Sequence, residues 1–453
     1  MFSLRKYSVL GIEKIIFFFI ITISILNACS PTEPTTNQTL DEVNSSSTPI
    51  ISFTQKTDPI IPIDPNDTSF RAIHMEGNWG TNQEVKNYIP DDYFKFLQDI
   101  NANWIGISVA LHIGDRMDST VERVYDGVRF PTFTDEELKV LIDAFHRKGL
   151  RVYLTLSLEE DKDAEYPVQH MQLGDPKLPS EDSEILPEFC PWSLDHPDHE
   201  DFVKEFWDTY TKQAVHFGEL AQDTGIEMYS LGTETDYLFR SRSGGYWEND
   251  FNSELVNLIS SVRSVYNGDL TYDMYYKAIV DRDFYGPGSD HLWEDLGLDV
   301  IGISAYFPLL DKIPATVPSV DSLEQSWQRI FDDYLIPLKN RYPDYPIIFL
   351  EFGFTNTLES SRWPGYGFYE NWTFKDNNNN GLDDGEETQA NIYDAFFNIR
   401  TQNPDIVEGC FLWGHTLAND ATWDVVFGKR IGFAVRQKLA QDIIRNHYLN
   451  DFD

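Results

Sequence analysis

The sequence predicts a (β/α)₈ barrel with enlarged loops, and three observations support this fold class. From about residue 70 onward, eight short apolar segments alternate with segments of helical period. Strands that alternate with helices favour a parallel sheet, and eight such units in one chain favour a closed barrel. The competing fold is a doubly wound open sheet, but no glycine-rich phosphate-binding sequence follows the first predicted strand.

Each predicted strand is a short run rich in β-branched and aromatic residues. In chain order the strands cover 71–79, 104–113, 150–158, 226–234, 270–279, 299–307, 346–354 and 407–415. The predicted helices carry apolar residues every three or four positions, and the first of them ends at a glycine. They cover 135–149, 200–225, 322–342, 389–402 and 436–449.

The N-terminus predicts export and a lipid anchor. Arg5 and Lys6 precede the apolar run IIFFFIITISIL, which suits a signal-peptide core and is short for a membrane span. The last leucine of this run begins the sequence LNAC, which resembles a bacterial lipobox, in which Cys29 is lipidated. We therefore expect a signal peptide at 1–28 and an anchor in the cell envelope, at the outer membrane because Ser30 follows the cysteine. The alternative is an ordinary signal peptide or membrane anchor with a chance cysteine.

Composition defines the remaining organisation. Residues 29–69 are rich in Ser, Thr, Pro and Asn and predict a flexible tether, which leaves 70–453 as the folded domain. The formal net charge of −39 repels nucleic acid and anionic lipid head groups, so we expect no nucleic-acid partner and membrane contact only through the lipid anchor. Cys190 and Cys410 predict two buried thiols and no disulfide framework.

Two glutamates stand at predicted strand ends. Glu234 follows the fourth strand in MYSLGTETDYL, and Glu351 ends the seventh in IIFLEFGF. The carboxyl ends of barrel strands share one rim, where active sites lie. Glycoside hydrolysis requires two such carboxylates: one protonates the leaving oxygen, and the other attacks the anomeric carbon or activates water. For either glutamate alone, the alternative is a structural ion pair.

Two further strand ends carry aromatic residues. The sixth strand ends in GISAYFP with Tyr306, and the eighth in FLWGH with Trp413. With the two glutamates, this arrangement resembles the clan A glycoside hydrolases, and within that clan it most resembles glycoside hydrolase family 113, whose known members cleave β-1,4-mannan. The resemblance implies that Glu234 is the acid/base and Glu351 the nucleophile of a retaining reaction. It also implies that Tyr306 donates a hydrogen bond to the nucleophile, that Trp413 floors the adjacent sugar subsite, and that catalysis needs no cofactor.

One position departs from the clan pattern. Thr233 stands where many members have an asparagine that binds the sugar 2-hydroxyl, and a threonine hydroxyl has a shorter reach. The rim also offers Trp79 as a stacking surface, and Asn78 and Tyr275 as candidates for sugar hydroxyl contacts. The nearby rim residues are expected to be structural or to position substrate; they are His74, Asp236 and His415.

Two other functions remain open at this point. A non-catalytic glycan-binding lipoprotein would share the anchor, the tether and the aromatic residues, but it would not need both rim glutamates. A metal-dependent hydrolase on the same barrel would need His and Asp ligands at strand ends, often as His-x-His on the first strand. That strand has only His74.

The segment DNNNNGLDDGEE, residues 376–387, matches the calcium loop of an EF-hand. Gly381 falls at position 6, where the loop turns sharply. The ligand positions 1, 3, 5, 7, 9 and 12 are Asp376, Asn378, Asn380, the Leu382 carbonyl, Asp384 and Glu387. We therefore expect a structural Ca²⁺ that pins the insertion after Glu351 to the barrel rim. The alternative is a polar, disordered loop.

Overall fold

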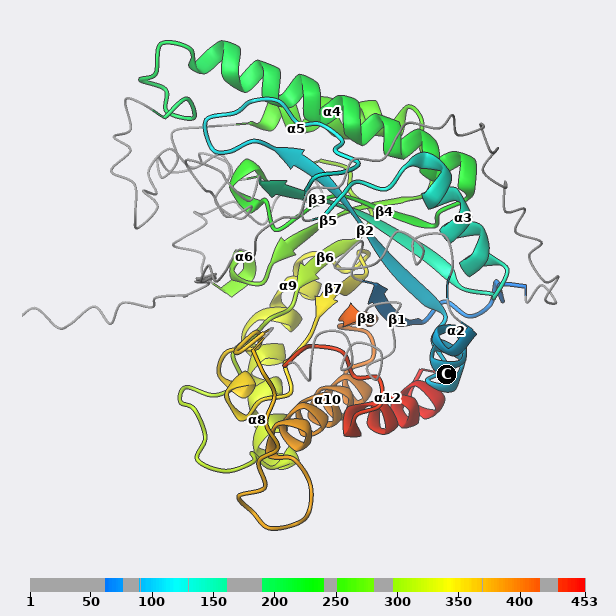
Figure 1. Ribbon diagram of the computed structural model, residues 1–453, viewed down its shortest axis with the longest axis vertical. Helices are drawn as coiled ribbons and strands as arrows, with labels where there is room; N and C mark the ends of the chain where they lie inside the picture. The colour runs from blue at the N-terminus through cyan, green and yellow to red at the C-terminus, as the bar shows by residue number, and fades with distance from the viewer. Residues whose placement is uncertain are drawn as a thin grey trace, which may run out of the picture. The chain divides into compact units, whose positions relative to one another are not determined.

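In this computed structural model the structure describes residues 62–75, 89, 91–128, 130–160, 190–239, 251–280, 296–368, 370–415 and 431–452. Eight parallel strands close into a barrel in sequence order, with helices around it (Figure 1). β8 pairs with β1 and closes the sheet. The strands are β1 (Phe70–Met75), β2 (Trp104–Ile113), β3 (Arg151–Glu160), β4 (Met228–Thr233), β5 (Asp269–Tyr275), β6 (Ile301–Ser304), β7 (Ile347–Phe352) and β8 (Gly409–His415). The predicted (β/α)₈ barrel is confirmed.

The α-helices that follow the strands vary widely in length, and α4 is the longest of those described. They are α2 (Asp91–Asp99), α3 (Asp135–His146), α4 (His199–Thr224), α5 (Asn252–Arg263), α6 (Lys277–Val280), α8 (Val320–Ile330), α9 (Ile336–Arg341), α10 (Asp384–Gln402) and α12 (Leu439–Asn450). Within the described part of the chain, no helix is long and apolar enough to span a membrane.

Alternation along the strands divides the core into two layers. The larger cluster fills the space between the strands and the surrounding helices. A smaller cluster fills the barrel interior with Ala72, Trp104, Tyr153, Met228, Val300, Ile348, Leu350 and Phe411. Buried polar side chains also stand on the interior of the strands, among them Thr155, Ser230, Asp273 and Ser304. The interior therefore passes from an apolar base to a polar layer at the carboxyl ends of the strands.

Most predicted elements differ from the structure by a few residues at their ends, and α2, α5 and α6 were not predicted. Two of the differences have a clear local cause. The fifth strand ends at Tyr275, not 279, because the Tyr275 N–H bonds the Asp236 carboxylate at 3.1 Å and no longer joins the sheet. The predicted helix 322–342 is α8, a π-helical turn over Phe331–Leu335, and then α9. Pro337 lies in the first turn of α9, where its missing N–H and its ring break the regular helical hydrogen bonds.

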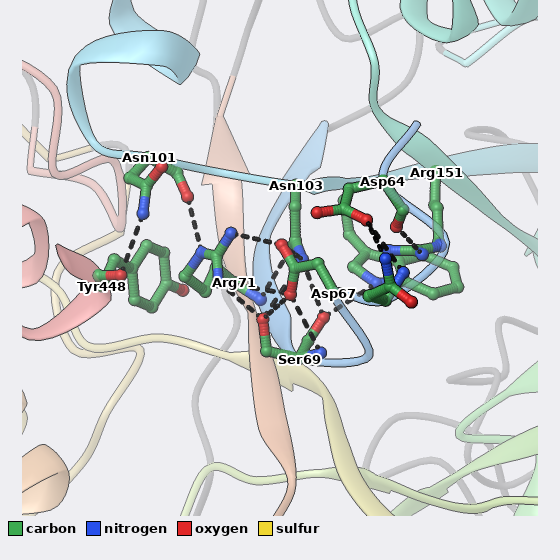
Figure 2. A network of polar contacts seen from close by, with 10 residues as sticks. Asp64, Asp67, Ser69, Arg71, Asn101, Asn103, Arg151 and Tyr448 are labelled. Atoms are coloured by element: carbon green, nitrogen blue, oxygen red, sulfur yellow. Dashed lines mark hydrogen bonds and ion pairs between the residues drawn. The ribbon is translucent and has the colours of Figure 1, made fainter. Parts of the chain in front are cut away.

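The chain before β1 is bonded to the amino-terminal end of the barrel (Figure 2). The Asp67 carboxylate accepts hydrogen bonds from Arg71 at 2.6 Å and from the Asn103 amide at 3.0 Å. Trp104 donates its indole N–H to the Ser69 carbonyl at 3.1 Å. Burial alone would raise the pKa of Asp67, but these hydrogen bonds and the Arg71 charge lower it. The last residues before β1 are thus fixed opposite the rim that carries the candidate site.

Candidate active site

Glu234 follows β4 directly and has an unusual backbone. Its φ is 51°, in the left-handed region that a glutamate rarely adopts. Such a conformation costs on the order of 1–3 kcal/mol and persists only where the surroundings hold it. The Glu234 N–H donates to the Asp273 carbonyl at 2.8 Å, and the residue is only 7% exposed. The fold therefore fixes the Glu234 backbone against β5, in a conformation that differs from the extended backbone of β4.

The two residues after Glu234 are also held by β5. The Thr235 hydroxyl forms a short hydrogen bond with the Tyr272 hydroxyl. The buried Asp236 carboxylate accepts the Tyr275 N–H with both oxygens, at 3.1 and 3.2 Å. This arrangement assigns Asp236 a structural part, as the sequence predicts. Residues 234–236 thus form one rigid turn, clamped at successive positions to the neighbouring strand.

Glu351 is the penultimate residue of β7 and is 6% exposed. The Tyr306 hydroxyl donates to its Oε2 at 2.8 Å, which is the hydrogen bond that the resemblance implies. Desolvation raises the pKa of Tyr306, and the charges of Glu351 and Glu234 raise it further. The Glu351 carboxylate and the Tyr306 hydroxyl are thus in contact at the rim, and the Glu234 charge acts on the same hydroxyl.

Trp413 on β8 is partly exposed and packs its ring on the edge of His74, with centroids 4.5 Å apart. The His74 nitrogens are engaged by the Leu350 carbonyl at 3.2 Å and the Ser108 hydroxyl at 2.9 Å. Burial lowers the pKa of His74 to about 4, so the ring is neutral near pH 7. His74 therefore supports the Trp413 ring, as expected of a structural residue.

The other predicted sugar contacts differ in their exposure and in their hydrogen bonds. Tyr275 is partly exposed, and burial and the nearby Tyr276 and Glu234 raise its pKa. The Thr233 hydroxyl shares a 2.7 Å hydrogen bond with the Thr155 hydroxyl inside the barrel. Asn78 and Trp79 lie outside the described residues, as does Cys29.

Asp273 is not among the site residues that the sequence predicts, yet it belongs to this region. It lies on β5 with no exposed surface. Burial raises its pKa well above the usual range, and the charges of Glu351, Glu234 and Asp236 raise it further. A period of two along TYDMYY, with Thr271 and Tyr275 on the same face, was the available signal for an inward acid.

Several side chains of the predicted calcium loop meet at Glu387. The amides of Asn378 and Asn380 donate to its two carboxylate oxygens, both at 2.9 Å. Asp376 accepts two backbone N–H groups of the loop. Asp384 is turned away and accepts N–H groups within the loop. Over the described ranges, no group of three or more His, Cys, Asp or Glu side chains could hold a metal, and the groups that reach Glu387 are amides.

A polar hollow of about 780 Å³ lies at the opposite end of the barrel, among residues that precede the strands. Its cations are already engaged: Arg71 pairs with Asp67, and Lys339 lies 4.0 Å from Glu408. Arg400 donates to three backbone carbonyls. Barrel enzymes place their chemistry at the carboxyl ends of the strands. The rim with Glu234 and Glu351 is therefore the candidate active site.

Comparison with known proteins gives a consistent result. The family model of Glycoside Hydrolase Family 113 matches residues 192–423, about half of the chain. A solved structure titled as a complex of a GH113 β-1,4-mannanase covers 84% of this chain and 99% of its own, at 19% identity and a TM-score of 0.58. The GH113 β-mannanase AaManA from Alicyclobacillus acidocaldarius covers 84% and 97%, at 17% identity and a TM-score of 0.57. None of the curated proteins searched matches the chain.

Proposed function

This chain belongs to glycoside hydrolase family 113, and we propose that it is a retaining hydrolase of β-1,4-mannan with Glu351 as nucleophile and Glu234 as acid/base. The observation that carries the proposal is the 2.8 Å hydrogen bond from Tyr306 to Glu351, at a hydroxyl on which the Glu234 charge also acts. The structures titled as β-mannanases support the choice of mannan.

In the first step the Glu351 carboxylate attacks the anomeric carbon while the bond to the leaving sugar breaks. Glu234 gives its proton to the departing oxygen, and a glycosyl ester forms on Glu351. Tyr306 keeps Glu351 charged and aimed, since a charge-assisted hydrogen bond favours the carboxylate. Glu234 then removes a proton from water, which attacks the same carbon and releases the sugar with its original configuration.

Around the reacting carbon, Trp413 offers a ring face to the sugar. It is partly exposed, and the neutral His74 ring fixes it from behind. Tyr275 offers a hydroxyl beside Glu234. Thr233 shares its hydroxyl with Thr155, so it contributes to binding by holding the end of β4 in place. Asn78 and Trp79 remain predicted sugar contacts.

The substrate proposal is tested by incubating the protein with β-1,4-mannan, xylan, β-1,4-glucan and galactan and measuring the release of reducing ends. We expect release from mannan first. Binding of mannan without release would favour the non-catalytic glycan-binding alternative, and release from another glycan alone would refute the substrate.

The roles of the two glutamates are tested separately. Glu351→Gln should abolish turnover, since no nucleophile remains. Glu234→Ala should retain activity on an aryl glycoside with a good leaving group, and azide should accelerate it by attacking the glycosyl ester. Azide should leave Glu351→Gln inactive. Near-native rates in both variants would refute the assignment.

For the loop 376–387 we propose a structural Ca²⁺ site. The support is the sequence spacing, together with the meeting of Asn378 and Asn380 at Glu387. A side-chain amide can present its oxygen in place of its nitrogen to the same point. Because Asp384 faces the loop backbone, position 9 would coordinate through water, as it often does. Calorimetry of chelated protein with added Ca²⁺ tests this, with Glu387→Gln as the control. No binding heat and no change in melting temperature would refute it.

For the compartment we propose a lipid anchor on Cys29 in the bacterial outer membrane. The support is the sequence LNAC after a signal-peptide core. Labelling of cells with a radioactive fatty acid should mark the native protein, and Cys29→Ala should be unlabelled and leave the membrane fraction. Equal membrane association of the two proteins would refute the anchor.

A further inference from the structure

Asp273 is a buried acid to which the proposed reaction gives no part. Its register places it beside Thr233 of β4 and Gly302 of β6, between the strands that lead to the two glutamates. Its side chain has no exposed surface, so substrate does not reach it. Its carbonyl accepts the Glu234 N–H at 2.8 Å. Asp273 thus lies beneath the candidate site, in direct backbone contact with one glutamate.

Gly302 on β6 has no side chain, and this lets side chains of β5 and β7 approach each other inside the barrel. A Cβ on Gly302 would lie 2.3 Å from Leu350 Cδ1 and 2.8 Å from Thr271 Oγ1. Leu350 belongs to β7 and Thr271 to β5, so side chains of these two strands meet across β6 at this level. Asp273 lies two residues beyond Thr271 on β5, and Glu351 follows Leu350 on β7 where the pairing with β6 shifts register.

The electrostatic surroundings of Asp273 are acidic. The charges that act on it most strongly are carboxylates on β7 and in the turn after β4, and they raise its pKa well above the usual range after burial has already raised it. The Ser304 hydroxyl on β6 opposes this only weakly. Two tyrosines, one on β3 and one at the rim, also interact electrostatically with Asp273. The titratable groups that face it are Glu351, Glu234, Asp236, Tyr153 and Tyr306.

We propose that Asp273 is a positioning residue for the nucleophile: it keeps its proton in the working enzyme and supports the charged form of Glu351 from inside the barrel. A protonated carboxyl has one O–H donor, whereas a carboxylate has none. The strongest charge that acts on Asp273 is that of Glu351, so a donor here stabilises that carboxylate. Glu351 is then supported from two sides, by Tyr306 at the rim and by Asp273 below.

This role rests on the proposed assignment of Glu351 as nucleophile, and the pH profile of kcat/KM on an aryl β-mannooligosaccharide tests it. Asp273→Asn keeps a neutral side chain with an N–H donor, so the acid limb should stay in place and the plateau should fall by no more than about threefold. Asp273→Ala removes the donor, and the acid limb should move up by about one pH unit, which is about tenfold in the acidic range.

Other outcomes overturn the proposal. If Asp273 were ionised, its repulsion of Glu351 would disappear in both variants, and both acid limbs would move to lower pH. If Asp273 were only structural, the two variants would lose activity in proportion to their folded fraction, with unchanged limbs. Asp273→Asn is the isosteric control for Asp273→Ala, so a difference between their limbs cannot come from loss of the charge.

An infrared measurement tests the protonation without substrate. The difference spectrum between the native protein and Asp273→Asn at pH 7 should contain the carbonyl band of a protonated carboxylic acid. A carboxylate band in its place would overturn the proposal even if both variants were inactive. This measurement also separates the proposed mannanase function from the proposed protonation of Asp273. If the native protein shows the acid band but hydrolyses no mannan, the substrate proposal is wrong and the protonation of Asp273 is still supported.

Discussion

The hydrogen bond from Tyr306 to Glu351 gives a prediction whose magnitude follows from its geometry. Tyr306→Phe removes a 2.8 Å donor to a carboxylate and keeps the ring. A hydrogen bond to a charged group contributes about 1.5–3 kcal/mol, and 1.36 kcal/mol corresponds to one pH unit in a protonation equilibrium. The full effect is therefore about one to two pH units. Because Tyr306 is partly exposed, water can replace part of the lost bond, and we expect about one unit.

The assay is the pH dependence of kcat/KM for the native protein and Tyr306→Phe, with melting temperatures measured over the same range. The acid limb should move to higher pH, because Glu351 becomes easier to protonate. Near the acid limb the variant should lose about tenfold in activity, and the loss should shrink toward the plateau. A uniform loss at every pH, or an acid limb that does not move, would refute the view that this hydroxyl stabilises the charged form of Glu351.

Three further predictions concern stability. Gly302→Ala should lower the free energy of unfolding by about 1–3 kcal/mol, because a Cβ there would lie 2.7 Å from the Tyr272 carbonyl; Gly365→Ala, whose Cβ would meet its nearest atom at 3.6 Å, should be close to neutral in the same denaturant titration. Burial lowers the pKa of His415 to about 3, so the neutral form is favoured in the folded state and stability should fall as pH drops below about 6.5. Replacing His415 with Leu should flatten this dependence of melting temperature on pH; an unchanged slope would contradict it. Asp67→Ala should lower the melting temperature and leave the rate at substrate saturation unchanged, since its hydrogen bonds lie at the opposite end of the barrel.

Much of the barrel follows from local sequence patterns. The segment WIGISVALHI predicts β2 with the bounds that the structure has, because every residue from 104 to 113 is apolar, small or β-branched apart from one histidine. The helix α5 was not predicted, although Leu255, Leu258, Ile259 and Val262 have helical spacing and are buried. The sequence therefore contains the signal for this helix. The break before α9 could also have been foreseen from Pro337.

The candidate site was only partly predictable, for a physical reason. Glu234, Glu351 and Tyr306 stand at the ends of apolar runs, so a parallel barrel brings them to one rim. The left-handed backbone of Glu234 depends on a hydrogen bond to a residue 39 positions later, and no local pattern contains that information. The same holds for Asp273, whose significance comes from neighbours on other strands.

Two features of this rim reduce the stability of the folded protein. A glutamate with a φ of 51° costs on the order of 1–3 kcal/mol. Burial raises the pKa of Asp273, and the carboxylates around it raise the pKa further, so this residue reduces stability as pH rises above the ordinary pKa of an aspartate. Glycine at position 234 and asparagine at position 273 would remove these two costs. Glu234 and Asp273 are joined by a backbone hydrogen bond between β5 and the turn after β4, and strain of this kind persists at sites that need a fixed geometry for chemistry. These two unfavourable features thus support the rim as the active site independently of any resemblance to known proteins. They also predict that Asp273→Asn is more stable than the native protein at pH 7.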